Sequence, residues 1–162
     1  MEDVPLRRAW AMAGVALLSL ACGRPELEGS LSELLDLHYQ KMDVIASEGE
    51  LSVRFTVPLK GGENVPLAVS LKTADLELVA HGNIDLAELI NGGPGQRGVV
   101  TRNVLNDPRK TFPPLQRGTL RMDALPTPGG EVPGQFSVTF AECIDFGCGR
   151  TVFGSFRAAV PK

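Results

Sequence analysis

Three cysteines are the residues of this chain best suited to covalent chemistry, and their positions differ in kind. Cys22 ends a run of apolar residues, whereas Cys143 and Cys148 stand close together near the C-terminus. An odd number of cysteines leaves one thiol over when two of them bond, and an exported protein rarely keeps a free thiol. We therefore expect Cys22 to be modified, and Cys143 and Cys148 to form a disulfide.

The spacing of Cys143 and Cys148 decides between three kinds of chemistry. Four residues separate them, whereas redox dithiols place two residues between their cysteines. A zinc site would need two further ligands, and the only histidines, His38 and His81, are distant in sequence. A disulfide across a hairpin tip is the simplest interpretation, and closing so short a loop contributes about 2 kcal/mol. We expect no metal and no other cofactor.

Residues 1–21 are predicted to be a signal peptide. Two arginines precede an apolar run over residues 9–20, about a dozen positions long, and a membrane-spanning helix needs about 20. Residues 18–22 (LSLAC) resemble a lipobox, the signal at which bacterial lipoproteins are cleaved and acylated on cysteine. Ser19 stands where a lipobox usually has an aliphatic residue.

Two interpretations of this cleavage site remain open. Ser19 and Ala21 also fit the small-x-small pattern of ordinary secretory cleavage, which would release a soluble protein. The cysteine count favours lipidation of Cys22, and several acyl chains hold a protein firmly on its membrane. Gly23 follows Cys22, and by resemblance to the enterobacterial sorting rule this residue suggests the outer membrane.

The mature chain is predicted to hold a lipidated tether over residues 22–29 and one domain over residues 30–162. After cleavage 141 residues remain, which is enough for one domain with a hydrophobic core. Gly and Pro make up 30 of the 162 residues, a share that suits short strands joined by turns.

Alternation of apolar and polar residues predicts the fold. It runs through residues 51–57, 65–71 and 76–78, and it is clearest in the last third of the chain. The three apolar stripes there are Leu120, Met122 and Ala124; Phe136, Val138 and Phe140; and Val152, Phe156, Ala158 and Val160. Successive strand side chains point to opposite faces, so each stripe should be buried. We predict an all-β protein, an antiparallel β-sandwich of about seven or eight strands.

Two segments depart from this alternation. Residues 30–33 (SLSE) match a helix-capping box, but residues 35–46 also alternate and lead into a turn, so we favour a strand there. Residues 106–114 contain three prolines, which cannot lie in a central strand because proline lacks the amide donor. We predict a crossover loop there, with Phe112 held against the sandwich.

Several blocks of the sequence resemble a group of small lipoproteins of myxobacteria. The blocks are residues 29–39, residues 102–120 (RNVLNDPRKTFPPLQRGTL), residues 136–140 (FSVTF) and residues 149–156 (GRTVFGSF). The resemblance covers most of the mature chain. It implies export, anchoring and a β-rich domain, and it implies no catalytic residue.

Catalysis is not expected. A serine nucleophile needs a neighbouring histidine, and the chain has no Gly-x-Ser-x-Gly elbow beside which His38 or His81 would act. Carboxylate pairs arise by chance among this many acidic residues, so they do not indicate a glycosidase.

Charge is distributed unevenly along the chain. Residues 22–95 hold five basic and twelve acidic residues, whereas residues 96–121 hold six basic and one acidic. Arg102, Arg109, Lys110 and Arg117 are therefore candidates for a patch that binds an anionic ligand. Spread over solvated strand faces, they would form no patch. The location and the net charge of −3 disfavour nucleic acid.

The sequence thus predicts a non-enzymatic structural or interaction domain of the bacterial envelope, anchored to the membrane by lipid. Loops around residues 91–117 are its expected contact surface, with an envelope protein or an anionic surface polymer as partner. The alternative is a module that binds a small lipid or glycan between its sheets, in a cavity lined by Phe136, Val138 and Phe156.

Overall fold

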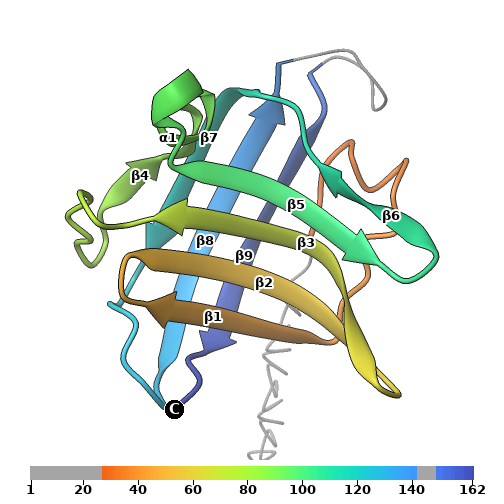
Figure 1. The fold of residues 1–162 in the computed structure, drawn as a ribbon, viewed down its shortest axis with the longest axis horizontal. Coiled ribbons are helices and arrows are strands. Elements are labelled where there is room, and N and C mark those ends of the chain that lie inside the picture. The colour runs from red at the N-terminus through yellow and green to blue at the C-terminus, as the bar shows by residue number, and fades with distance from the viewer. Residues whose placement is uncertain (1–26, 142–148) are drawn as a thin grey trace, which may run out of the picture.

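The computed structural model describes residues 27–141 and 149–162 (Figure 1). The predicted signal peptide, the lipidation site Cys22 and the predicted disulfide between Cys143 and Cys148 lie outside these residues. Within the described ranges, no helix is long and apolar enough to cross a membrane.

The described chain forms nine strands and two short helical turns. The strands are β1 (Lys41–Ser47), β2 (Glu50–Leu59), β3 (Gly62–Lys72), β4 (Asn83–Asp85), β5 (Gly98–Val104), β6 (Asp107–Thr111), β7 (Leu115–Met122), β8 (Glu131–Phe140) and β9 (Thr151–Ala159). The turns are α1 (Leu86–Asn91) and the 3-10 turn η1 (Gly93–Gly95). The all-β class is therefore confirmed.

All nine strands belong to one sheet, in the order β4-β7-β8-β9-β1-β2-β3-β5-β6. Adjacent strands of the sheet pair antiparallel, except β1 and β9. These two strands run parallel and are paired at Asp43 and Ala159. The sheet is therefore mixed and continuous, and the predicted purely antiparallel arrangement of separate sheets is not confirmed. The difference arises because the last strand, which pairs antiparallel with β8 on one side, lies beside the first strand on its other side and runs parallel to it.

The sheet curls, so that its two halves face one another. In Figure 1, β1, β2, β3 and β5 lie in front and cross over β7, β8 and β9 behind them. Phe55 of β2 and Phe136 of β8 meet in the space between, with ring centroids 5.5 Å apart. Fully burying an aromatic side chain of this kind contributes about 1.5–3 kcal/mol. The predicted inward stripes of the last three strands form the back wall of this core, except Ala124, which lies beyond the end of β7 and is half-buried.

The N-terminal segment differs from its prediction. Strand β1 begins at Lys41, whereas the predicted strand began at residue 35. Residues 31–35 form a single turn, in which the Leu35 amide donates to the Leu31 carbonyl at 3.1 Å. Leu31 and Leu37 are buried in the core. Burial of these leucines at one end of the curled sheet stabilises the turn more than the weak alternation of residues 35–40 favours a strand.

Residues 27–29 of the predicted tether are already part of the folded sheet. Leu27 is buried, and Glu28 exchanges two backbone hydrogen bonds of 2.9 Å with Phe153 of β9. Gly29 has a φ of 117°, and a side chain there would collide with the Thr151 carbonyl. Residues 27–29 are thus part of the fold, because they pair with the stretch of β9 that β1 leaves free.

Two further segments differ from the alternation pattern. Residues 76–78, predicted as strand, lie in the loop between β3 and β4. Residues 107–111, predicted as loop, form β6, which tolerates a proline because it is the outermost strand of the sheet. Phe112 follows it and is buried as predicted, its ring stacked on Phe140 with centroids 5.1 Å apart.

The short helix α1 was not predicted. Asp85 caps it, because its carboxylate accepts the Glu88 amide at 3.1 Å, and Leu89 and Ile90 are buried behind it. An acidic residue followed three positions later by glutamate before apolar residues is a capping signal, so the sequence did contain the information.

Candidate functional site

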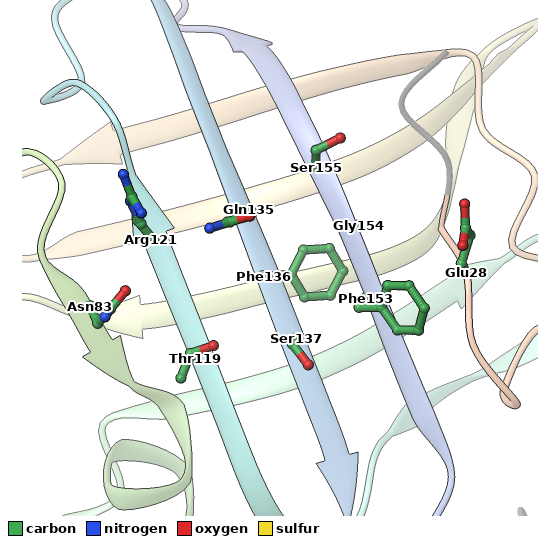
Figure 2. Close-up of a pocket in the computed structure, with 10 residues that line it drawn as sticks. All are labelled: Glu28, Asn83, Thr119, Arg121, Gln135, Phe136, Ser137, Phe153, Gly154 and Ser155. Atoms are coloured by element: carbon green, nitrogen blue, oxygen red, sulfur yellow. The ribbon is translucent and has the colours of Figure 1, made fainter. Parts of the chain in front are cut away.

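An open hollow of about 610 Å³ lies on the outer face of β4, β7, β8 and β9 (Figure 2). We call it the outer hollow. Its lining residues are Glu28, Asn83, Thr119, Arg121, Gln135, Phe136, Ser137, Phe153, Gly154 and Ser155. The hollow is on the opposite side of the sheet from the core, so it is not the cavity between sheets that the alternative hypothesis required.

Strand register explains why these side chains gather. Gln135 and Ser137 point outward because Phe136 and Val138 point into the core. Pairing of β8 with both neighbours aligns two cross-strand rows, which we call the upper and lower rows. The upper row is Asn83, Arg121, Gln135 and Ser155, and the lower row is Thr119, Ser137, Phe153 and Glu28.

Five of the lining side chains are neutral and polar. They are the amides of Asn83 and Gln135 and the hydroxyls of Thr119, Ser137 and Ser155. All five are exposed. Within residues 27–141 and 149–162, the hydrogen bonds between protein groups include none to these five side chains. Their donors and acceptors are therefore available to a ligand.

The charges of the outer hollow nearly cancel. Arg121 is its one cation among the described residues, and its Nε lies 3.2 Å from the Asp123 carboxylate just beyond β7. The same Asp123 oxygen lies 3.3 Å from Nδ1 of His81. Glu28 adds a negative charge at the opposite side of the hollow. The site does not have the electropositive character of an anion-binding cleft.

Phe153 gives the polar lining one apolar surface. Phe153 is 41% exposed and points outward, because the neighbouring positions Val152 and Gly154 of its strand face inward. The two backbone bonds to Glu28 hold its main chain in place. Figure 2 shows its ring at the edge of the hollow, on the strand next to Ser137. An exposed aromatic ring on a hydrogen-bonded strand, next to polar groups, is typical of a recognition surface.

The predicted anion patch is not assembled as expected, because Arg102 is not on the surface. It is 5% exposed. Its Nη1 donates to the Asp36 carbonyl at 2.8 Å and to the Pro66 carbonyl at 3.3 Å, and its Nε donates to Asp107 at 3.3 Å. Pro66 lies at a register shift between β3 and β5. Arg102 therefore bonds to backbone carbonyls inside the fold, one of them at this register shift. The prediction that Arg102 belongs to a surface patch for an anionic ligand was wrong.

The other three patch candidates occupy different settings. Arg117, on β7, is exposed, and its Nε donates to the Thr139 hydroxyl at 3.2 Å. Arg109 and Lys110 belong to β6, and their side chains lie outside the described part of the structure. Arg97 and Arg121, the flanking basic residues, are half-buried. The structure thus supports no common surface built around Arg102.

The two histidines show no catalytic arrangement in the described residues. His38 is exposed, and its backbone amide donates to the Asp36 carboxylate. His81 is also exposed, and Asp123 is its side-chain partner among the described groups. Across the described ranges no three His, Cys, Asp or Glu side chains gather as metal ligands would.

Sequence reasoning missed the outer hollow. The signal was present in the residues between the apolar stripes, since Thr119, Gln135, Ser137 and Ser155 are small or neutral where exposed strand positions often carry lysine or glutamate. Their convergence depends on the pairing of β7, β8 and β9, which a single strand pattern does not specify.

Comparison with family models, with curated proteins and with solved structures finds no match to this chain.

Proposed function

We propose that this chain is an exported lipoprotein, acylated on Cys22, whose domain is a non-enzymatic interaction module of the bacterial envelope. The outer membrane is the proposed location. Two observations support it: the predicted leader over residues 1–21 and the place of Glu28 at the edge of the outer hollow.

The place of Glu28 carries the proposal. Glu28 lines the outer hollow, and its backbone pairs with Phe153. Six residue steps from Cys22 to Glu28 span at most about 21 Å when extended. A lipid on Cys22 would therefore hold the Glu28 edge of the outer hollow within about that distance of the headgroups. The anchor and the candidate binding face would then share one region of the molecule.

The disulfide is a second element of the proposal. Strands β8 and β9 remain paired up to Thr139 and Thr151, and the Phe140 amide donates to the Arg150 carbonyl at 2.9 Å. The segment with Cys143 and Cys148 therefore connects two hydrogen-bonded antiparallel strands. A disulfide in that connection would restrict the loop of a hairpin in an oxidising compartment.

We further interpret the curled sheet as a β-sandwich whose two layers are continuous through the β9–β1 junction. The Phe55–Phe136 contact and the buried stripes on both halves support this interpretation. The position of Phe136, Val138 and Phe156 in the core argues against a ligand held between the layers.

Incorporation of radiolabelled palmitate tests the anchor. The wild type and a Cys22→Ala variant should be compared in a bacterial host, with Cys143→Ala as a matched control that also removes one thiol. We expect label in the wild type and in Cys143→Ala, and none in Cys22→Ala. An unlabelled wild type, or label that persists in Cys22→Ala, would overturn the lipoprotein proposal.

A further inference from the structure

We propose that the outer hollow is a binding site for a neutral oligosaccharide. This inference rests on the proposed function, since it names the class of envelope component that the interaction module would contact. It is carried by the lining residues, their charges and the exposed ring of Phe153, whose main chain is hydrogen-bonded to Glu28.

The size and polarity of the hollow fit a small polar ligand. Its volume of about 610 Å³ falls within the range of about 300–1,000 Å³ found for small-molecule sites. Most such sites are largely apolar, whereas this one offers two amides and three hydroxyls. A lipid acyl chain would cover these groups without bonding to them, which costs free energy for each group left unpaired. A ligand rich in hydroxyl groups would satisfy them instead.

The charges argue against an anionic ligand. A phosphate or a polyanion would require uncompensated cations, but Arg121 already lies beside Asp123. A polyanion that reached the Arg121 guanidinium would also lie in the same small hollow as Glu28. A neutral ligand meets neither problem, and both charged groups can form charge-assisted hydrogen bonds with its hydroxyls.

Phe153 supplies the contact that selects a sugar from other polar ligands. The two faces of a pyranose ring carry C–H groups, which pack on an aromatic ring while the hydroxyls at the rim of the sugar point sideways. Phe153 is exposed, and Ser137, its Cα partner on β8, lies beside it in the lower row. The C–H face and the hydroxyl rim of one sugar residue therefore find matching groups next to each other.

The two rows suit more than one sugar residue. Neighbouring strands are about 4.8 Å apart, and alternate residues along one strand are about 6.8 Å apart. The upper row presents Asn83, Gln135 and Ser155 across three of the four strands, so hydroxyls along an extended oligosaccharide would meet a donor or acceptor on successive strands. Because the strand backbone fixes this grid, little ordering is needed on binding.

Calorimetric titration of the detergent-purified full chain tests the proposal. The probes are the neutral oligosaccharides chitotetraose, cellotetraose and maltotetraose, and inorganic polyphosphate. We expect saturable binding of at least one of the three oligosaccharides, and no saturable binding of polyphosphate. No binding of any of the three oligosaccharides at millimolar concentration would overturn the proposal, as would polyphosphate binding that depends on Arg121.

Variants locate the binding within the molecule. Phe153→Ala should weaken oligosaccharide binding about tenfold, because it removes the stacking surface. Leu105→Ala is the matched control, since Leu105 is an exposed apolar side chain in the turn between β5 and β6. Gln135→Ala should weaken binding about fivefold, and Arg157→Ala, on the same face of β9 but outside the hollow, should leave it unchanged. Equal effects of variants and controls would overturn the assignment.

A spectroscopic variant gives a direct readout at the same position. Trp10 is the sole tryptophan of the chain, so Phe153→Trp in a Trp10→Phe background carries one indole, at the hollow. We expect oligosaccharide to shift its fluorescence, and an unchanged spectrum at saturating ligand would contradict stacking at this position. Palmitate labelling tests the anchor in a separate assay, so loss of sugar binding and loss of anchoring are distinguishable.

Discussion

The outer faces of the two halves of the sheet are both polar, but they use their polar groups differently. On the half formed by β1, β2 and β3, the outward side chains bond to one another. These contacts are the ion pairs Lys41–Asp43, at 2.8 Å, and Arg54–Glu63, and the hydroxyl pair Ser52–Ser70, at 2.8 Å. On the half formed by β4, β7, β8 and β9, the outward amides and hydroxyls of the outer hollow have no such bonds among the described residues.

The difference shows that alternation sets only which side chains face outward. Cross-strand pairing decides whether those side chains serve the fold or remain available. Ser52 and Ser70 are Cα partners and share a hydrogen bond, whereas Ser137 is paired with Thr119 and Phe153 and shares none within the described residues. Pairs of the first kind add about 0.2–1 kcal/mol each to the sheet. Polar groups of the second kind contribute little to stability and remain available to a ligand.

Arg102 provides the largest expected effect, and it separates a structural charge from a surface charge. Arg102→Ala leaves two backbone carbonyls and Asp107 without this donor in a buried place, so the free energy of unfolding should fall by about 3 kcal/mol. Arg117→Ala, on the exposed side of β7, should change it by less than about 0.5 kcal/mol. Urea unfolding of both variants measures the difference. Equal stabilities would mean that Arg102 is not an internal anchor.

Gly134→Ala tests the packing beneath the outer hollow. A β-carbon at Gly134 would lie 2.5 Å from both the Phe156 ring and the Arg121 carbonyl. Forcing these groups apart should cost about 2 kcal/mol. Gly62→Ala is the control, because no atom lies within 4 Å of a β-carbon there. Thermal unfolding should show a clear loss for Gly134→Ala alone, and similar melting temperatures of the two variants would show that the sheet has room at this point.

Two serine variants, one on each outer face of the sheet, test whether the two faces differ in hydrogen bonding. Their expected effects are the smallest. Ser52→Ala removes the hydrogen bond to Ser70 and should lower the free energy of unfolding by about 1 kcal/mol. Ser137→Ala removes no hydrogen bond to another described group, so its effect should stay within about 0.5 kcal/mol. Denaturant titrations of both variants decide the matter. A larger loss for Ser137→Ala would reverse our assignment of the two faces.

Much of the fold was predictable because burial and alternation coincide in the long strands. The stripes around Phe136 and Phe156 are buried as the period of two requires. The prediction was wrong where tertiary contacts outweighed the local pattern. Residues 35–40 lead up to β1 without joining it, and Leu37 in this stretch is buried in the core. Residues 107–111 form an edge strand despite Pro108, because an edge position does not require its missing donor.

The candidate site was much less predictable than the fold. Arg102 was selected for its charge, but its guanidinium donates a hydrogen bond to the Pro66 carbonyl, at a register shift between β3 and β5. No local sequence pattern predicts that register shift. The outer hollow was missed because a single neutral residue such as Gln135 or Ser137 does not indicate a binding site in the sequence. These residues form a candidate site only because the pairing of β7, β8 and β9 places them next to Phe153 and Arg121.

Backbone chemical-shift mapping during titration with the tightest-binding of the three oligosaccharides tests the availability of the outer hollow most directly. We predict that the amide signals of residues 119–121, 135–137 and 153–155 move as the sugar is added, while those of residues 52–56 and 68–70 stay in place. Shifts centred on the β1–β3 face, or shifts spread evenly over both halves, would contradict the assignment of recognition to one face of the sheet.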